Sequence, residues 1–435
     1  METIFALSSG ALPSGVAVIR ISGTETSAIL SALCEGILKP RVMHYRTLKD
    51  GCGDIIDNGL VVFFKGPQSF TGEDCAELHI HGGRAVVQKL LDVLGAFPNC
   101  RQAEAGEFAR RAFAEGKLDL TEAEGLADLI EAETESQRKL ALMGASGALA
   151  ELYRNWRKEL IFCRAMIEAE LDFADESDVP GSVSDEVWQR VSALKQSIEQ
   201  HIEDGKRANI MRDGLRIVIA GAPNAGKSSL INRLAGRKVA IVTNEAGTTR
   251  DALEVRLVIS GVPVLITDTA GLRKTDNHIE KAGIEIAEEH ILTADLVLML
   301  EDMQNPTPID LPKTEANIWH IGNKLDYGQG EDERWPLQIS AATGENWQEF
   351  IDRLEAFCSA RAGDVSKLVP ARKRQVSLLA SGMQELECSL EKHDIDLELR
   401  AEHLRLAANA IGRITGDVDV EDLLDVIFSE FCIGK

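Results

Sequence analysis

The sequence lacks features that define several classes of protein. Its eight cysteines are scattered singly, without a C-x-x-C pair, so a zinc ribbon and a disulfide framework are both disfavoured. No charge-free apolar run approaches about 18 residues, the length that predicts a membrane span. The first five residues include an acidic one where a signal peptide has basic ones. These absences predict a cytoplasmic protein that does not enter a membrane.

The chain also lacks an excess of basic residues. Its formal net charge is −23, whereas a protein that binds nucleic acid by general phosphate neutralisation is basic. The charge disfavours generic nucleic-acid binding but permits a specific RNA task that uses local basic patches or a partner's surface. At 435 residues the chain is too long for one core, and roughly two to four domains are expected.

Proline is missing from two long stretches, between Pro98 and Pro180 and after Pro370. Both are rich in Ala, Leu, Glu and Arg, which favour helices. The first predicts long helices over 118–173 with interruptions at three small residues, Gly125, Gly144 and Gly147. In the second, apolar side chains share one helix face at positions 420, 423, 424, 427, 428 and 431. We interpret the two stretches as one helical domain with another domain inserted between them; two separate helical domains are the alternative.

Residues 1 to about 117 contain short β-rich runs between turn residues, such as 16–21 and 59–64, which predicts a mixed α/β segment. A further strand over 72–83 alternates polar and apolar side chains. Its polar face carries Glu77, His79 and His81. Since no third ligand stands at a telling spacing, we favour a solvated strand face over a metal site.

The clearest motif is a glycine loop, Gly221-Ala-Pro-Asn-Ala-Gly226-Lys227-Ser228, between an apolar run and an apolar-periodic segment. Strand, glycine loop and helix is the context that a phosphate-binding loop requires. Backbone N–H groups of such a loop surround phosphate oxygens, helped by the positive end of the helix. Lys227 would reach the β and γ phosphates, and Ser228 would ligate Mg²⁺. The alternative is a glycine-rich turn that happens to carry Lys-Ser.

The segment around this loop, from about 213 to 358, alternates strand and helix signals. This pattern predicts a mostly parallel sheet whose ligand loops follow the carboxyl ends of the strands. The candidate strands are 216–220, 253–259, 263–267, 295–300, 317–321 and 337–340.

Three further motifs follow these strands. Asp268-Thr-Ala-Gly271 can hold Mg²⁺ through water and touch a γ-phosphate. In Asn323-Lys324-Leu-Asp326, the Asp326 carboxylate can accept both N–H donors of a guanine edge. The backbone amides of Ser340-Ala341-Ala342 can meet the guanine O6. Each motif is weak alone, but the four in this order predict GTP as the nucleotide.

Between the first two motifs lies Thr243-Asn-Glu-Ala-Gly247-Thr-Thr-Arg-Asp251. A threonine hydroxyl there can complete the Mg²⁺ shell while the γ-phosphate is present; a plain surface loop is the alternative. The residue after Gly271 is Leu272, not a glutamine that orients the attacking water. A second carboxylate, a cation or a partner chain is then needed to complete catalysis.

These motifs and the terminal Phe431-Cys432-Ile-Gly-Lys435 resemble the MnmE (TrmE) family, the bacterial and organellar GTPases of tRNA wobble-uridine modification. The resemblance covers the whole chain, including Arg20-Ile-Ser-Gly23 and Phe70-Thr-Gly-Glu-Asp74. It implies a multidomain α/β plus all-α fold: an N-terminal α+β folate-binding domain that dimerises, a helical domain, and an inserted Ras-like P-loop GTPase domain. The implied boundaries are 1–117 for the first, 118–212 and 359–435 for the two parts of the helical domain, and 213–358 for the GTPase domain.

The resemblance also implies roles for individual residues. GTPase domains of this family pair transiently across the dimer in a potassium-dependent way, with potassium in the place of an arginine finger. Ser228 and Thr249 would hold Mg²⁺, and K⁺ would be held by Asn224, Thr243, Glu245 and Thr248. The catalytic carboxylate matches Glu280, which without the resemblance would be an exposed first-turn glutamate. The GTP-binding set is Asn224, Ala225, Gly226, Lys227, Ser228, Ser229, Thr243, Asn244, Glu245, Ala246, Gly247, Thr248, Thr249, Asp268, Thr269, Ala270, Gly271, Asn323, Lys324, Asp326, Ser340, Ala341 and Ala342.

For a one-carbon folate such as 5-formyltetrahydrofolate, the family pattern maps onto Arg20, Glu77, Lys117 and Lys435. A carboxylate suits the donors of a pterin ring, and basic side chains suit the glutamate tail; ordinary surface charges are the alternative. Cys432 is a candidate nucleophile, with only Lys435 nearby to lower its pKa.

The implied reaction transfers a carbon unit to C5 of the wobble uridine, with glycine or ammonium as the amine, giving a carboxymethylaminomethyl or similar group. The resemblance implies a flavin-containing partner, in a heterotetramer or larger complex that handles tRNA. Because this chain has no G-x-G-x-x-G fingerprint of its own, FAD and NADH would belong to that partner. Two alternatives are a ribosome-assembly GTPase switch, which would need a basic RNA-binding module, and a folate-dependent enzyme that GTP merely regulates.

Overall fold

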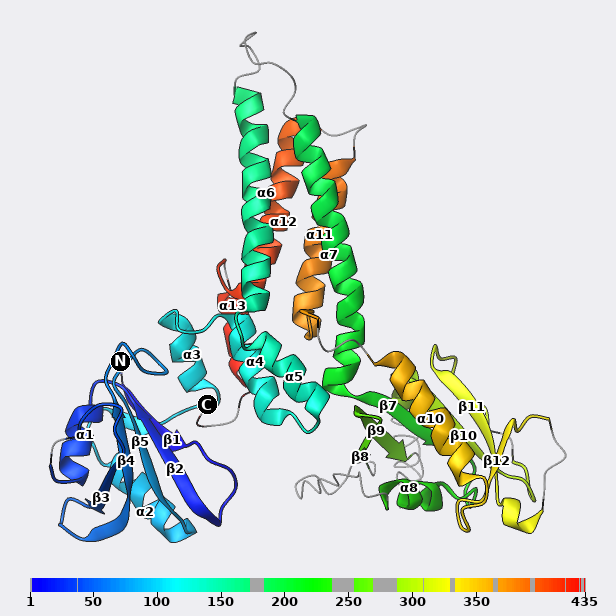
Figure 1. Cartoon of the computed structure of the whole chain (residues 1–435), viewed down its shortest axis with the longest axis horizontal. Helices are drawn as coiled ribbons and strands as arrows, with labels where there is room; N and C mark the ends of the chain where they lie inside the picture. The colour runs from blue at the N-terminus through cyan, green and yellow to red at the C-terminus, as the bar shows by residue number, and fades with distance from the viewer. Residues whose placement is uncertain are drawn as a thin grey trace, which may run out of the picture. The chain divides into compact units, whose positions relative to one another are not determined.

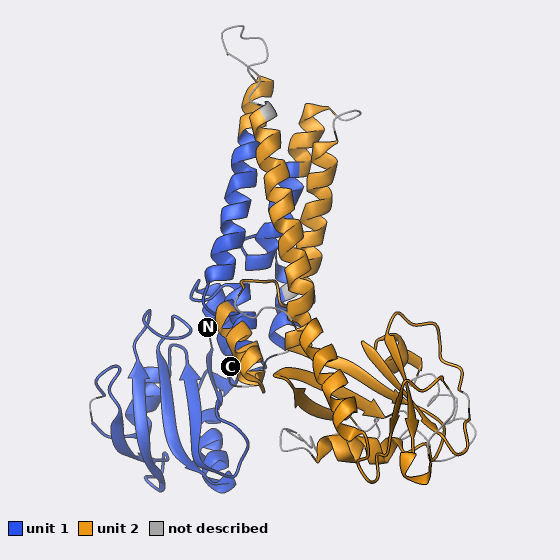
Figure 2. Ribbon diagram, turned by 45° about the vertical axis from the view of Figure 1, so that its right-hand side comes forward, with its two compact units in different colours: residues 1–127, 144–165, 404–435 blue, residues 128–143, 166–403 orange. Residues whose placement is uncertain are grey.

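The computed structural model describes residues 2–36, 38–172, 184–236, 254–268, 288–307, 309–328, 333–362, 367–391, 396–418, 420–429, 431 and 434. The chain forms two compact units, coloured separately in Figure 2. Unit 1 contains residues 1–127, 144–165 and 404–435, and unit 2 contains 128–143 and 166–403.

Unit 1 contains a mixed six-stranded sheet in the order β3-β4-β5-β2-β1-β6. Apart from the parallel pair β1–β6, neighbouring strands run antiparallel. Its strands are β1 (Thr3–Leu7), β2 (Ser14–Ser22), β3 (His44–Lys49), β4 (Ile55–Phe64), β5 (Cys75–Gly82) and β6 (Cys100–Gln102). Helices α1 (Thr26–Leu33) and α2 (Arg84–Gly95) supply apolar side chains to its core, such as Ile29, Leu90 and Leu94. The predicted strands at 16–21, 59–64 and 72–83 are confirmed.

The remaining helices of unit 1 come from both proline-free stretches. They are α3 (Glu107–Ala114), α13 (Glu421–Ser429) and parts of α4 (Leu120–Glu131), α6 (Ala148–Asp172) and α12 (Leu397–Thr415). Val420, Ile427, Phe428 and Phe431 share one apolar cluster with Leu120 and Ala123 of α4. The helix face predicted for the C-terminal segment is therefore confirmed at these positions, and it packs against the first helical stretch.

One predicted interruption is wrong. Gly125 lies inside α4, which continues to Glu131. A Cβ at Gly125 would stand 2.4 Å from the backbone nitrogen of Ala145. The glycine therefore serves close packing of two backbones and not a break in the helix.

Unit 2 contains a six-stranded sheet in the order β12-β11-β10-β7-β9-β8, parallel except for β8 (Figure 1). Its strands are β7 (Leu215–Ala220), β8 (Glu254–Ile259), β9 (Val262–Asp268), β10 (Leu296–Asp302), β11 (Asn317–Asn323) and β12 (Leu337–Ile339). All six strands predicted for this segment are confirmed, with ends shifted by one or two residues. The core is rich in β-branched and leucine side chains, such as Ile217, Ile219 and Leu298, as expected for strands buried on both faces.

Helices of unit 2 flank this sheet and extend from it. They are α5 (Glu135–Gly144), α7 (Ser184–Asp213), α8 (Lys227–Ala235), α10 (Trp347–Arg361) and α11 (Lys373–Leu390), with a short 3₁₀ turn at Leu325–Tyr327. Helix α11 runs along α7 (Figure 1). The long α7 leads directly into β7, the strand that precedes the glycine loop.

Helix α7 carries a buried titratable group, from which a pH-dependent stability follows. Burial lowers the pKa of His201 to about 4, against an ordinary value of 6.5. The folded chain holds the imidazole neutral, while the unfolded chain takes up a proton below about pH 6.5. We expect this residue to lower the free energy of unfolding by up to about 3 kcal/mol as the pH falls from about 6.5 to about 4.

The measurement is urea unfolding of the wild-type chain and of His201→Leu at about pH 7.5 and about pH 5. Other groups also titrate in this range, so the quantity that matters is the difference between the two proteins. The variant is expected to lose less stability on acidification than the wild type. Equal losses in both would contradict the assignment to His201.

Candidate nucleotide site

The predicted motifs meet at one edge of the sheet in unit 2. Strands β7, β9, β10, β11 and β12 run parallel, so their carboxyl ends lie together. The glycine loop follows β7, Asp268 ends β9, and Asn323 ends β11. Asp268 is buried at 2% exposure and stands in register with Ile219 of β7. The edge therefore gathers the phosphate motifs, after β7 and β9, and the base motifs, after β11 and β12, with β10 between the two pairs.

The glycine loop requires glycine at two positions. Gly226 has φ +101°, and a Cβ there would stand 2.1 Å from the side-chain nitrogen of Asn323. At Gly221 a Cβ would stand 2.2 Å from the Leu300 carbonyl oxygen. Asn224 also lies in the left-handed region, with φ +66°, and its side chain is exposed at the tip of the loop. The loop is thus packed at its base and open at its tip.

Lys227 begins α8 and is buried. Its ammonium donates to the carbonyl oxygens of Gly221 (2.7 Å) and Ala222 (3.0 Å). The positive charge is therefore held over the loop. Ser228 and Ser229 follow on the first turn of α8 with exposed side chains. A helix amino terminus with an adjacent lysine provides the electrostatics that phosphate binding needs.

Asn323 joins the glycine loop to the loop after β12. Its side-chain nitrogen donates to the Ala225 carbonyl at 2.7 Å, and its side-chain oxygen accepts the Ala341 N–H at 3.0 Å. Both bonds are buried. One amide therefore fixes the spacing between the phosphate side and the base side of the site.

Asp326 is exposed and is oriented from one side. The Ser340 hydroxyl donates to its Oδ1 at 2.6 Å, and the same hydroxyl accepts the Thr343 N–H at 3.0 Å. Because a carboxylate has about four acceptor positions, Asp326 keeps capacity for two more donors. Ala342 is exposed beside it. This geometry can accept the paired N–H donors of a guanine edge.

Two contributors to this edge were missed from the sequence. Arg233 of α8 donates to the carbonyl oxygens of Ala341 (3.0 Å), Ala342 (3.0 Å) and Thr343 (3.1 Å), so it holds the loop that follows β12. Asp302, the last residue of β10, forms an ion pair with Lys324 at 2.6 Å. Neither belongs to a recognisable motif, and both act through contacts between distant segments, so no local signal marks them.

Several predicted residues lie outside the described residues. They are Thr243, Asn244, Glu245, Ala246, Gly247, Thr248, Thr249, Thr269, Ala270, Gly271, Glu280, Cys432 and Lys435. The part of the site that the structure describes thus comprises the glycine loop, Asp268, and the loops after β11 and β12.

In unit 1, Arg20 and Glu77 face each other across β2 and β5. The Arg20 guanidinium donates to Glu77 Oε1 from Nη2 (3.0 Å) and from Nε (3.3 Å), and it stacks 5.2 Å from the Phe70 ring centroid. Glu77 Oε2 lies 3.4 Å from His79 Nε2. The carboxylate is thus held between two nitrogen-bearing side chains and remains about one quarter exposed, at 23%.

Lys117 is exposed, and its Cε stands 3.3 Å from where a Cβ on Gly72 would lie. The C-terminal tail also reaches this domain, since Ser8 Oγ donates to the Gly434 carbonyl at 2.8 Å. Ser8 directly follows β1, in which Ala6 is the partner of Arg20. The described part of the tail therefore lies beside the strands that carry Arg20 and Glu77.

The predicted solvated face of β5 holds for His81, which is 73% exposed and bonded to Asp57. His79 is more covered, at 22% exposure, beside Glu77. Among the described residues, no group of three or more His, Cys, Asp or Glu side chains has the geometry to hold a metal ion. Likewise, none of the helices that the structure describes is long and apolar enough to cross a membrane.

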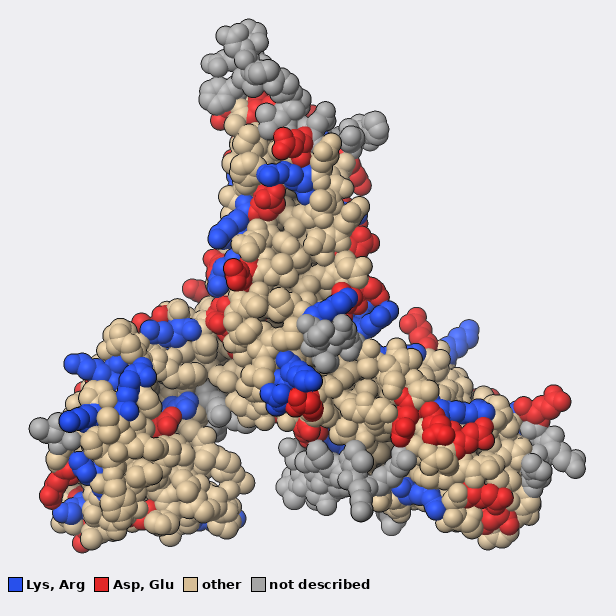
Figure 3. Space-filling view, viewed as in Figure 1, with Lys and Arg blue, Asp and Glu red and all other residues tan. Residues whose placement is uncertain are grey.

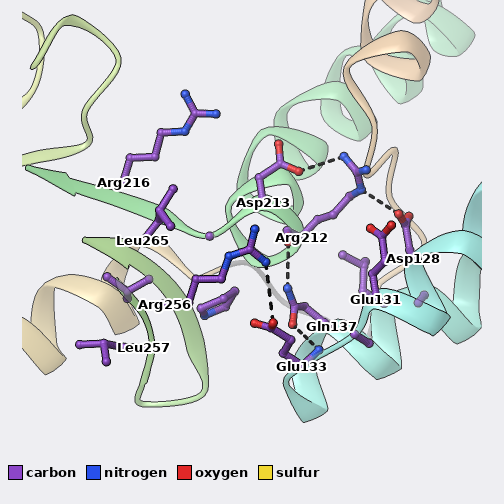
Figure 4. A pocket seen from close by; sticks show the side chains of 16 residues that line it. Asp128, Glu131, Glu133, Gln137, Arg212, Asp213, Arg216, Arg256, Leu257 and Leu265 are labelled. Carbon is purple, nitrogen blue, oxygen red and sulfur yellow. Dashed lines mark hydrogen bonds and ion pairs between the residues drawn. The ribbon is translucent and has the colours of Figure 1, made fainter. Parts of the chain in front are cut away.

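A polar cavity of about 420 Å³ lies away from the nucleotide edge (Figure 4). It is lined by the start of β9, the end of α7 and residues 128–141. Two pairs of its charged side chains contact each other: Arg212 bonds Asp128 at 3.0 Å, and Arg256 lies 3.7 Å from Glu133. Gln137 donates to the Arg212 carbonyl at 2.9 Å. These contacts connect β8 and the end of α7 to α5 and the residues just before it.

Comparisons with known families and proteins place this geometry in context. A family model described as the MnmE helical domain matches residues 120–432, and one described as the GTP-binding protein TrmE N-terminus matches residues 3–117. The tRNA modification GTPase MnmE of Bartonella tribocorum is 61% identical over 435 residues, covering 100% of both chains. The protein of the same name from Brucella canis is 59% identical over 434 residues, covering 100% of this chain and 98% of the relative.

Among solved structures, the G domain of the T. maritima FeoB iron transporter is 24% identical to this chain. The match covers 33% of this chain and 98% of that domain, with a TM-score of 0.24.

Proposed function

The chain belongs to the MnmE (TrmE) family of tRNA modification GTPases, and from this premise we propose that it hydrolyses GTP in a potassium-dependent, dimer-activated reaction that drives wobble-uridine modification. The observation that carries the GTP assignment is the pair of hydrogen bonds by which the Asn323 side chain contacts both the glycine loop and the loop after β12. It joins a phosphate cradle to a carboxylate that suits guanine. GTP hydrolysis then acts as the switch and not as the modifying chemistry itself.

In this proposal, the phosphates lie against the glycine loop and Lys227, with Mg²⁺ held by Ser228 and Thr249. Asp326 would read the guanine edge, and because the Ala341 N–H is bonded to Asn323 Oδ1, the Ala342 N–H would be the backbone amide that meets O6. Asn224, with Thr243, Glu245 and Thr248, would hold potassium, which would supply the positive charge that an arginine finger gives other GTPases. Glu280 polarises the attacking water. The exposed position of Asn224 at the loop tip supports a role toward a second GTPase domain.

The one-carbon folate would bind in unit 1 near Arg20, Glu77 and Lys117, with Lys435 from the C-terminal tail. Support comes from Gly434, which bonds Ser8 next to the strand that pairs with β2. Cys432 belongs to the same tail and is the candidate nucleophile. The domains would be 1–117, 118–212 with 359–435, and 213–358, and the shared apolar cluster of α4 and α13 supports the joining of the two helical parts.

A flavin-containing partner would supply FAD, NADH and part of the tRNA surface, in a cytoplasmic complex built on a dimer of this chain. The net charge of −23 supports a complex in which the partner contributes basic surface for tRNA and this chain contributes the GTPase. Figure 3 shows acidic side chains gathered over the α10 region, where the helix carries Glu349, Asp352 and Glu355. Such a surface repels phosphates, so a partner with a basic surface would strengthen tRNA binding.

The proposed function is tested in bacteria that lack the gene, by mass spectrometry of tRNA wobble uridines. We expect C5-modified uridines to disappear on deletion, to return with the wild-type chain and to stay absent with Lys227→Ala. The control variant Glu349→Gln removes an exposed charge from α10 and should restore modification fully. Unchanged modified uridines in the deletion strain would refute the proposal.

A further inference from the structure

The end of β10 meets the loop that carries Lys324. Parallel pairing of β10 with β11 places Asp302 in register with Asn323. The Asp302 carboxylate therefore stands next to Lys324, and its Oδ2 accepts from the Lys324 ammonium at 2.6 Å. This is a charge-assisted hydrogen bond, the stronger kind in proteins. Lys324 itself adopts φ +71°, in the left-handed region.

The turn that follows Asp302 makes two more bonds to the same loop. The backbone N–H of Met303 donates to the Asn323 carbonyl at 3.2 Å, and the Gln304 side chain donates to the Gly328 carbonyl at 3.3 Å. The turn is itself fixed, since Asp302 Oδ1 accepts the Gln304 N–H at 2.9 Å. Residues 302–304 thus bond the segment 323–328 at three places: at its first residue, at Lys324 and at its last residue.

The packing beneath this turn is also close. A Cβ on Gly322 would stand 2.6 Å from the Met303 sulfur and 3.1 Å from the Trp335 ring. Met303 and Trp335 are both buried. Burial alone would raise the pKa of Asp302, but hydrogen bonds from Lys324 and the Gln304 backbone lower it overall, so the carboxylate stays charged. The charged Asp302 carboxylate therefore faces Lys324 from a closely packed turn.

We propose that Asp302 is a positioning residue for base recognition, holding the Lys324 ammonium so that the lysine stem forms one wall of the guanine pocket. The inference rests on the proposed guanine site at Asn323, Lys324 and Asp326. Asp302 does not touch the base; it acts through Lys324. Without its anchor, the flexible lysine loses side-chain entropy when a base binds, and the wall is no longer preformed.

The test replaces Asp302 with asparagine, which keeps the shape and the Oδ1 acceptor for Gln304 but removes the charge. With the full chain and N-methylanthraniloyl-labelled GDP and GTP as probes, we expect both Kd values to rise by up to about tenfold, the upper end of the cost of ordering one long side chain on binding. The ratio of the two Kd values should stay the same, because the phosphate side is untouched. The control Glu349→Gln should bind both like the wild type.

A double-mutant cycle separates positioning from a general effect on the fold. Lys324→Ala is expected to weaken binding by itself, and adding Asp302→Asn to it should change the Kd by less than about twofold. A merely structural role of Asp302 would make the two effects additive. Additive effects, or Asp302→Asn binding within about twofold of the wild type, would overturn the inference.

The guanine site itself is checked separately with Asp326→Asn. If that variant still binds labelled GDP tightly, the proposed base site is wrong. If it loses GDP while Asp302→Asn does not, the base site stands and only the positioning role of Asp302 fails.

Discussion

Replacing Asp326 with asparagine is expected to change the preferred base from guanine to xanthine. The carboxylate would accept the N1–H and the 2-amino group of guanine, whereas an amide presents its own NH₂ to that amino group. Two donors then face each other, and we expect affinity for GTP to fall on the order of 10³-fold or more, as when a site built for hydrogen bonds is left unpaired. Xanthine carries an oxygen at position 2, so the amide can donate to it while accepting N1–H.

The structure indicates that this substitution changes the hydrogen-bonding groups of residue 326 without changing its shape or its bond to Ser340. The asparagine side chain differs from aspartate by one atom, and its Oδ1 would still accept the Ser340 hydroxyl that now bonds Asp326 at 2.6 Å. Steady-state hydrolysis of GTP and of xanthosine triphosphate, each as a function of concentration, gives the two kcat/KM values. The matched control Asp310→Asn, an exposed aspartate elsewhere in unit 2, should retain the preference for GTP. An Asp326→Asn enzyme that still prefers GTP would contradict the assignment of this carboxylate to the base.

Much of the sheet in unit 2 was predictable because its signals are local. The run 217–220 is apolar, β-branched in part, and bounded by glycine, and the strand observed is Leu215–Ala220. The same holds for the strand that ends at Asp268. Parallel strands between helices bring their carboxyl ends together, so motifs that follow different strands had to converge on one edge.

The supporting contacts were not predictable, because they depend on register and on packing between distant segments. Arg233 looks like any charged residue of a short helix, yet it bonds three carbonyls more than 100 residues away. Asp302 meets Lys324 only through the pairing of β10 with β11. The prediction at Gly125 was wrong for the same reason. A glycine in a helical stretch suggested a break, but the glycine is there because the backbone of Ala145 approaches it closely.

The potassium assignment gives the second large effect. Asn224 is exposed, with φ +66°, and an amide oxygen there can bind a monovalent cation beside the phosphates. We expect GTP turnover to be faster in KCl than in NaCl at equal ionic strength. Asn224→Ala should lose this stimulation, with turnover in KCl falling by on the order of 10³-fold, the low end of what an arginine finger contributes to phosphoryl transfer. Glu280→Ala should lose turnover in both salts.

Backbone strain has to be separated from loss of the ligand, because alanine is disfavoured at positive φ by roughly 1 kcal/mol. Asn224→Gly removes the same side chain without that strain. If the amide binds potassium, both variants lose the stimulation while binding of labelled GDP stays close to that of the wild type. If the glycine variant keeps the stimulation, strain in the loop is the cause and the ligand role is wrong. Equal wild-type rates in KCl and NaCl would refute potassium dependence altogether, and the missing glutamine at Leu272 would then call for a protein group to neutralise the transferred charge.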